Sequence, residues 1–202
     1  MAYKGTHLTT ANAAVADRFI TVTAMKRGTY GAPANAGAMP DSGARHVTIG
    51  LTRNDAVDAP LGTVTITGTD LAGNVISEVI TPLDNTTATG ALWFKTVTAV
   101  VGGNTWITAG AADSIVVGCT AARILVQGSG VLHAVVVNTA AAGAITLADA
   151  GGTIAVLKSG IAEGFYGPFD VNFSGYLSVL MAANTDITVL HTGSKPTVYA
   201  MS

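Results

Sequence analysis

The chain has 202 residues but only 22 charged side chains, of which 10 are Lys or Arg and 12 are Asp or Glu. This charged fraction of 11% compares with about 25% in an average soluble domain. The net charge is −2, so the chain lacks the basic excess that neutralises phosphates, and we do not expect nucleic acid as a partner. Soluble monomers normally carry a well-charged surface. We therefore expect other chains to cover much of this exterior in an assembly.

The composition indicates an all-β fold. Glycine occurs 24 times, and Thr, Val and Ala are frequent while Lys and Glu are scarce. Small and β-branched residues pack well in pleated sheets, which predicts antiparallel β-sandwich or barrel units. The one cysteine, Cys119, follows an apolar run, so we expect a buried free thiol and no intrachain disulfide. No apolar run has the length and continuity of a membrane helix, and we expect no membrane partner.

In chain order, residues 1–16 are polar and without a clear period, which predicts an extended N-terminal arm. Residues 17–24 alternate and predict a strand. Residues 25–44 carry Gly and Pro at close intervals and predict a long loop. Loops of about 20 residues are uncommon in compact domains unless they have a task. Two interpretations stay open: an unstructured surface loop, or a segment that orders against a neighbouring molecule.

The next part of the chain completes a predicted β-rich domain over residues 17–120. Residues 46–52 place three apolar side chains on one face. Residues 63–69 and 75–81 alternate in the same way and flank a short turn with Gly73, which predicts a hairpin. Residues 91–101 predict one long strand, followed by strands at 105–108 and 114–119.

Residues 121–202 predict a second sandwich-like domain, because turn signals recur about every 8 to 12 residues. The predicted strands cover 124–126, 131–138, 144–147, 153–157, 167–171, 176–180 and 186–190. No Pro- or Ser-rich linker separates this part from the first. Two separate domains and one continuous stack of sheets therefore both fit the sequence.

The residues that usually carry chemistry are sparse and scattered. The histidines have no metal-ligand spacing; they are His7, His46, His133 and His191. Asp55 and Asp58 lack the spacing of a calcium loop. The only glutamates, Glu78 in a strand with solvent-facing neighbours and Glu163 in a turn, are not brought together by any pattern, as a glycosidase would need. We expect no enzyme activity, no catalytic residue, no cofactor and no metal site.

The few aromatic residues offer the main alternative. Trp93 and Phe94 adjoin in a predicted strand and must face opposite ways. We expect one in the core and the other at solvent or at a partner. Sugars stack on aromatic rings, so a glycan platform with Trp93, Trp106 and Tyr166 remains a second hypothesis.

The Thr-, Val- and Gly-rich alternation carries a resemblance to a known class. Residues 63–81 and 94–100, and later 135–138, 143–147, 175–179 and 186–189, resemble stretches of virion structural proteins of tailed bacteriophages. The resemblance implies a structural protein without catalytic residues that is made in the host cytoplasm and placed on the capsid surface as a decoration (cement) protein. The implied partners are the major capsid protein and copies of itself, with a trimer favoured. The alternative is a neck, tail or fibre component that binds a receptor or glycan.

The residues expected to contact such partners lie in three places. Tyr3, Lys4 and His7 belong to the predicted arm. Arg27 and Tyr30 belong to the predicted loop. The two tryptophans complete the set; they are Trp93 and Trp106.

Overall fold

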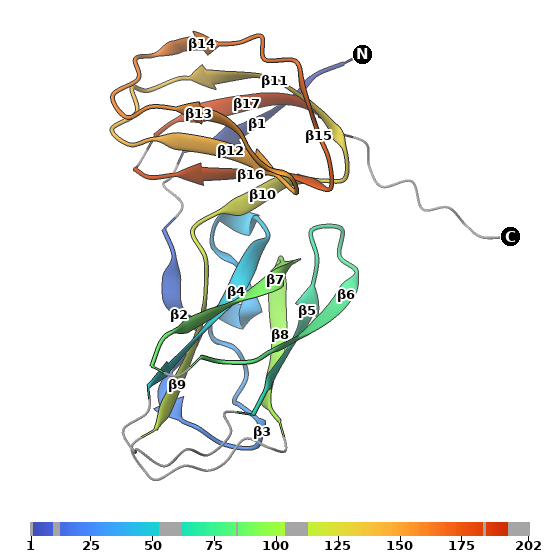
Figure 1. Ribbon diagram of the computed structural model, residues 1–202, viewed down its shortest axis with the longest axis vertical. Coiled ribbons are helices and arrows are strands. Elements are labelled where there is room, and N and C mark those ends of the chain that lie inside the picture. Colours follow the sequence, from blue (N-terminus) through green and yellow to red (C-terminus); the bar gives the residue numbers. More distant parts are fainter. Residues whose placement is uncertain are drawn as a thin grey trace, which may run out of the picture. The chain divides into compact units, whose positions relative to one another are not determined.

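The computed structural model describes residues 2–9, 13–52, 62–83, 85–103, 113–183 and 185–193 (Figure 1). The chain divides into two compact units. The middle unit is Ala14–Ala121, and the terminal unit combines Met1–Ala13 with Ala122–Ser202. The described residues form antiparallel sheets and only two short 3-10 helices, η1 (Ala34–Gly37) and η2 (Pro40–Ser42). The predicted all-β class is confirmed.

The middle unit is a sandwich of two four-stranded sheets. One sheet has the order β2 (Val15–Ala24), β9 (Ser114–Cys119), β4 (Arg45–Thr52), β7 (Thr87–Phe94). The other has the order β3 (Gly28–Thr29), β8 (Thr96–Gly102), β5 (Val64–Thr69), β6 (Val75–Ile80). Alternation builds the core: Val47, Ile49 and Leu51 of β4 are buried against residues of the facing sheet, because every second side chain of a strand points the same way.

The terminal unit is a second sandwich, with its own core. One sheet has the order β1 (Lys4–Leu8), β17 (Ile187–Gly193), β11 (Gly130–Val137), β14 (Gly164–Tyr166), and β15 (Val171–Phe173) also pairs with β11. The other has the order β10 (Arg123–Gln127), β16 (Tyr176–Met181), β12 (Ile145–Asp149), β13 (Gly152–Leu157). Leu132 and Val189 of the first sheet and Leu147 and Val179 of the second are fully buried in that core.

The predicted hairpin at residues 63–81 is confirmed. β5 and β6 pair in register from Val64 opposite Ile80 to Thr69 opposite Val75. The turn between them is closed by Asp70, whose carboxylate accepts hydrogen bonds from the backbone and side-chain amides of Asn74 at 2.9 and 3.0 Å. Gly73 takes a positive φ of 91° there, a conformation that costs glycine little.

The prediction of one strand over residues 91–101 is wrong. The chain leaves the first sheet of the middle unit after β7 and enters the second as β8, with Lys95 between them. Phe94 and Val97 are both buried in the core. Because Val97 comes three positions after Phe94, strict alternation would point the two side chains to opposite faces, and the strand has to break.

The predicted strand at 167–171 is also wrong. Gly167 to Asp170 connect β14 to β15 without strand pairing of their own. Pro168 has no N–H to give to a sheet, and Asp170 has a positive φ of 49°. Both features favour a bend over an extended strand.

The N-terminal segment is not the free extended arm that the sequence predicts. Lys4–Leu8 form β1, which pairs with β17 over five residues, and β2 already begins at Val15. The segment is polar, and its partner strand lies about 180 residues further along the chain. The local sequence therefore contains no signal for this pairing. The terminal unit otherwise begins at Ala122, beside the predicted boundary at 120/121.

The long loop at 25–44 lies against its own unit. Met25, Tyr30 and Met39 are buried in the middle-unit core. The Tyr30 backbone N–H donates to Val100 at 3.0 Å, and the Arg18 Nε–H donates to the carbonyl of Ala38 at 2.8 Å. The segment is therefore ordered by intramolecular contacts.

Candidate interaction surface

The strand β1 gathers three of the residues predicted to contact partners, Tyr3, Lys4 and His7. Tyr3 directly precedes the strand and is 46% exposed. Its ring stacks on His133 of β11 with 4.1 Å between the centroids, and its hydroxyl donates a weak hydrogen bond to Asp170 at 3.5 Å. His133 Nδ1 and Asp170 Oδ1 lie 2.6 Å apart. These contacts join β1 to two segments that are distant in sequence.

Phe165 of β14 extends this group, which we call the Tyr3 cluster: Tyr3, His133, Phe165 and Asp170. The Phe165 ring meets His133 edge-on at 6.3 Å and is 54% exposed. Edge-to-face pairs of this kind hold rings in fixed orientation. The cluster therefore presents two half-exposed aromatic rings beside a carboxylate.

A second group forms around His7 at the other end of β1. His7 Nε2 lies 2.6 Å from Asp186 Oδ1, and the Asn138 side-chain amide donates to the same oxygen at 2.7 Å. The hydrogen bond from Asn138, and next that with His7, hold the pKa of the Asp186 carboxyl below its ordinary value. A charged Asp186 is the form that these contacts stabilise.

The inner side of β1 is held by packing and by one buried histidine. Leu8 is 5% exposed and belongs to the core of the terminal unit. The Thr6 hydroxyl contacts His191 Nε2 at 2.9 Å, and His191 itself is 3% exposed. Burial, and to a smaller extent the charge of Lys4, lower the pKa of His191. This histidine is therefore favoured in its neutral form.

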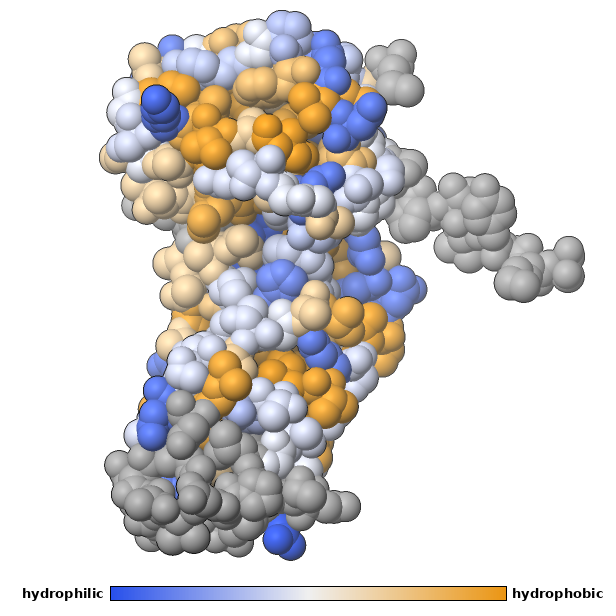
Figure 2. Space-filling model, in the orientation of Figure 1, coloured by the Kyte–Doolittle hydropathy of each residue, from blue (hydrophilic) through white to orange (hydrophobic). Residues whose placement is uncertain are grey.

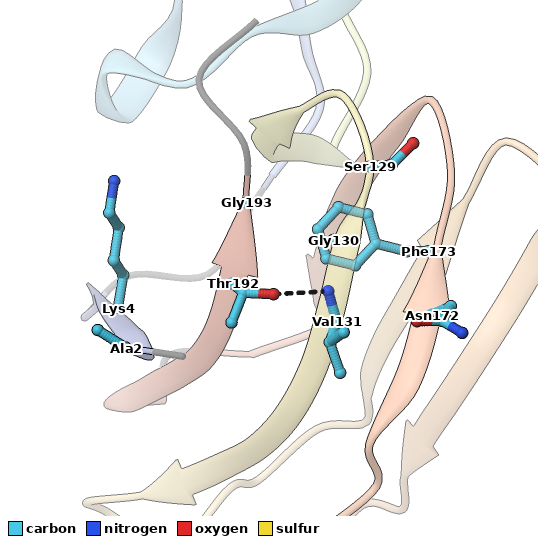
Figure 3. Close-up of a pocket in the computed structure, with 9 residues that line it drawn as sticks. All are labelled: Ala2, Lys4, Ser129, Gly130, Val131, Asn172, Phe173, Thr192 and Gly193. Atoms are coloured by element: carbon cyan, nitrogen blue, oxygen red, sulfur yellow. Dashed lines mark hydrogen bonds between the residues drawn. The ribbon is translucent and has the colours of Figure 1, made fainter.

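An open pocket of about 560 Å³ lies where β1 begins (Figure 3). Lys4 and Phe173 stand on opposite flanks of β17, and the Thr192 hydroxyl accepts a hydrogen bond from the Val131 N–H at 3.0 Å. Of the nine lining residues only Lys4 is charged. The nine lining residues thus combine apolar side chains with hydroxyl and amide groups and include no acid–base pair.

The remaining predicted contact residues lie in the middle unit. Arg27 is exposed, whereas Tyr30 is 3% exposed and belongs to the core, so the prediction of a partner contact at Tyr30 is not supported. Trp93 is half-buried and its ring lies 3.7 Å from that of His46, while Phe94 is fully buried. Opposite faces for Trp93 and Phe94 are thus confirmed. Trp106 lies outside the described residues, as do Asp55 and Asp58.

Glu78 has a role that the sequence did not reveal. The sequence predicts only that it lies in a strand with solvent-facing neighbours. In the structure, its carboxylate accepts hydrogen bonds from the backbone N–H groups of Ala91 at 2.5 Å and Leu92 at 3.1 Å. β6 and β7 are edge strands of the two sheets of the middle unit. Glu78 therefore occupies backbone donors on the β7 edge that another strand could otherwise pair with.

Cys119 is a buried free thiol, as predicted. Burial raises its pKa, which disfavours the reactive thiolate. Within the described ranges, no group of three His, Cys, Asp or Glu side chains is arranged to hold a metal ion. No helix among the residues that the structure describes has the length and apolar character to cross a membrane.

Comparison with protein-family models, with curated proteins and with solved structures finds no match.

Proposed function

We propose that this chain is a structural component of a tailed-bacteriophage particle, a decoration protein that binds the capsid and copies of itself by adhesion and without chemistry. The observation that carries the proposal is the exposure of large apolar side chains on a chain with very little charge. Ten such side chains are at least 37% exposed among the described residues, and they occur in both units. Isolated exposed apolar residues are ordinary, but here few charges surround them.

Two groups of the exposed apolar residues lie close together on the sheets. Val75 and Val79 of the edge strand β6 are 77% and 63% exposed. Two further exposed leucines are near in sequence: Leu83 follows β6, and Leu92 belongs to the edge strand β7. In the terminal unit, Val156 and Leu180 both stand opposite Thr146 on the outer face of one sheet. On the face drawn in Figure 2, orange and pale surface predominates and strongly hydrophilic residues are scattered. Such surfaces favour protein contacts.

The proposal also uses the sequence resemblance of the β5–β6 hairpin region to phage virion proteins. A symmetric shell repeats each binding site many times, so contacts that are weak individually add up on it. Exposed edge strands such as β6 and β3 provide backbone groups for added strands. A neutral β-protein with apolar edges suits this kind of attachment.

The test is co-sedimentation of the purified chain with purified heads of the phage that encodes it. We expect saturable binding with a fixed ratio to the major capsid protein. Val75→Asp and Val79→Asp place charges on the β6 edge without touching the core and should lower the occupancy. Thr21→Asp, at an exposed polar position on β2, is the control for added charge. Absence of binding by the folded wild-type chain would reject the proposal.

A second candidate, glycan binding by a tail or fibre component, is favoured by the Tyr3 cluster. Its two half-exposed rings lie beside the Asp170 carboxylate, and sugars bind aromatic faces with flanking polar groups. The rings first expected in this role are less available: Tyr166 packs against the core and donates its hydroxyl to Ala162, and Trp93 contacts His46. A glycan array with wild type and Phe165→Ala tests it; a signal that survives this substitution excludes the cluster.

A further inference from the structure

The strand β1 stands apart from the rest of its unit in the chain. Every other strand of the terminal unit follows Ala122, whereas β1 precedes the 108 residues from Ala14 to Ala121. β1 is also an edge strand, and β17 is its one pairing partner among the described strands. The terminal unit thus receives its edge strand from a short segment that another folded unit separates from it in sequence.

The site that receives β1 is built entirely by residues after Ala122. Backbone pairing runs along β17 from His191 to Ile187. The side-chain contacts go to His133, Asp170, Asp186 and His191. None of these contacts uses the middle unit, so the same site would accept Tyr3–Leu8 of a second copy with the same bonds.

The side chains on both faces of β1 fit the groups that surround them in this site. Leu8 fills the core, Thr6 meets the buried His191, and His7 meets Asp186 on the opposite side. Gly5 has no side chain, and a Cβ there would lie 3.1 Å from the Thr188 Cγ2 and 3.5 Å from the Leu190 Cδ2. The site is therefore complementary to the side chains of this short segment, which every copy of the chain carries.

From this we propose that β1 is an exchangeable strand: β1 of one copy adds to β17 of a second copy and links the two. The contacts in the exchanged and unexchanged forms are identical, so the balance depends on concentration. We take the effective concentration of the intramolecular strand as about 1 mM, the order of magnitude for tethered binding sites. Copies held side by side on a common surface reach such local concentrations, whereas dilute copies retain their own β1. This inference holds whether or not that surface is a phage head.

Exchange has a structural consequence for assembly. Reciprocal exchange between two copies closes a dimer, and one-way exchange links copies into rings or open chains. In either case the β17 edge stays covered, and no unpaired row of backbone groups is left for unspecific association. β1 then links two copies of the chain through the same contacts that it makes within one copy.

Disulfide trapping between full-length chains tests the exchange. Gly5 and Leu190 are register partners on β1 and β17, so a cysteine at each position is within disulfide reach. All variants carry Cys119→Ala to remove the native thiol. Chains with Gly5→Cys are mixed with chains with Leu190→Cys, equilibrated under reducing conditions and oxidised briefly. We expect about half of the chains to be exchanged at about 1 mM and about 1% at about 10 µM. These fractions follow from the ratio of the chain concentration to the effective concentration of the intramolecular strand.

Two controls make the result decisive. The double variant Gly5→Cys/Leu190→Cys must form an intramolecular disulfide at low concentration, which shows that the pair is competent. Gly5→Cys mixed with Val156→Cys, at a 53% exposed position on the other sheet, measures random collision. Disulfide-linked heterodimer above this background at about 1 mM supports exchange. A competent double variant with no heterodimer above background overturns the proposal.

Discussion

His7 Nε2 lies 2.6 Å from Asp186 Oδ1, so the first strand of the chain is tied to the residue that precedes the last described strand. The two residues are 179 positions apart in sequence. Together with the stacking of Tyr3 on His133, this contact places the N-terminal segment on the sheet of the terminal unit. The consequences for stability and assembly can be measured.

Acid should loosen β1 through Asp186. The pKa of this carboxyl is lowered in the folded chain by Asn138 and His7, so its contribution to stability is present above the unfolded pKa of about 3.9 and is lost as pH falls through the lower folded value. Asp186→Asn should expose the β1 amides to faster hydrogen exchange near neutral pH, and the difference from wild type should close on acidification below about pH 4. Glu163→Gln, in an exposed turn, is the control. A difference that persists unchanged in acid would contradict the assignment.

His191 should produce a second pH dependence in a different range. Burial lowers its pKa in the folded chain, so unfolding binds a proton once pH falls below the unfolded value of about 6.5. The stability of the terminal unit should therefore be fully present above that pH and decrease on acidification through the lowered folded pKa. His191→Gln should flatten this slope in hydrogen exchange of β17. An equal slope in wild type and variant would show that another group is responsible.

Glu78 should limit association through the edge of the middle unit. Removing its carboxylate in Glu78→Ala frees the N–H groups of Ala91 and Leu92 that it now occupies, and unpaired edge strands recruit further strands. We expect a higher sedimentation coefficient that increases with concentration. Glu163→Ala removes the same charge from an exposed turn and should sediment as wild type does. Identical behaviour of the two variants would assign the effect to net charge.

The core of the middle unit should respond strongly to truncation at Phe94. This side chain is fully buried, and Phe→Ala in a core costs about 3 to 5 kcal/mol. Val75→Ala, at a 77% exposed position, should change the free energy of unfolding by less than about 0.5 kcal/mol. Both tryptophans of the chain, Trp93 and Trp106, belong to the middle unit, so denaturation followed by tryptophan fluorescence reports this unit selectively. Comparable losses in the two variants would be inconsistent with the described core.

The sequence predicts most strands where local alternation is strict. Val47, Ile49 and Leu51 identify β4, and the turn around Gly73 identifies the β5–β6 hairpin. The change of sheet at Lys95 was missed, although the spacing of Phe94 and Val97 contains the signal for it. Periodicity reports which face is buried, but it does not tell which sheet a strand joins.

The candidate surface was less predictable, because long-range pairing creates it. Tyr3, Lys4 and His7 were expected at a partner, but nothing local indicates that β17 is their neighbour. Phe165 and Asp170 belong to the Tyr3 cluster because β14 pairs with β11 and the bend after β14 brings Asp170 to His133. Burial of Tyr30 likewise depends on how a Gly- and Pro-rich segment folds back onto its own core, which turn signals do not specify.

The most direct test of the proposed structural role is the copy number of the chain in purified phage particles, measured by quantitative mass spectrometry against the major capsid protein. A decoration protein occurs in a fixed ratio set by the symmetry of the shell, and that ratio stays constant between preparations and through salt washes. A chain that is absent from the particles, or present in trace amounts that vary from one preparation to the next, would contradict a role in the capsid.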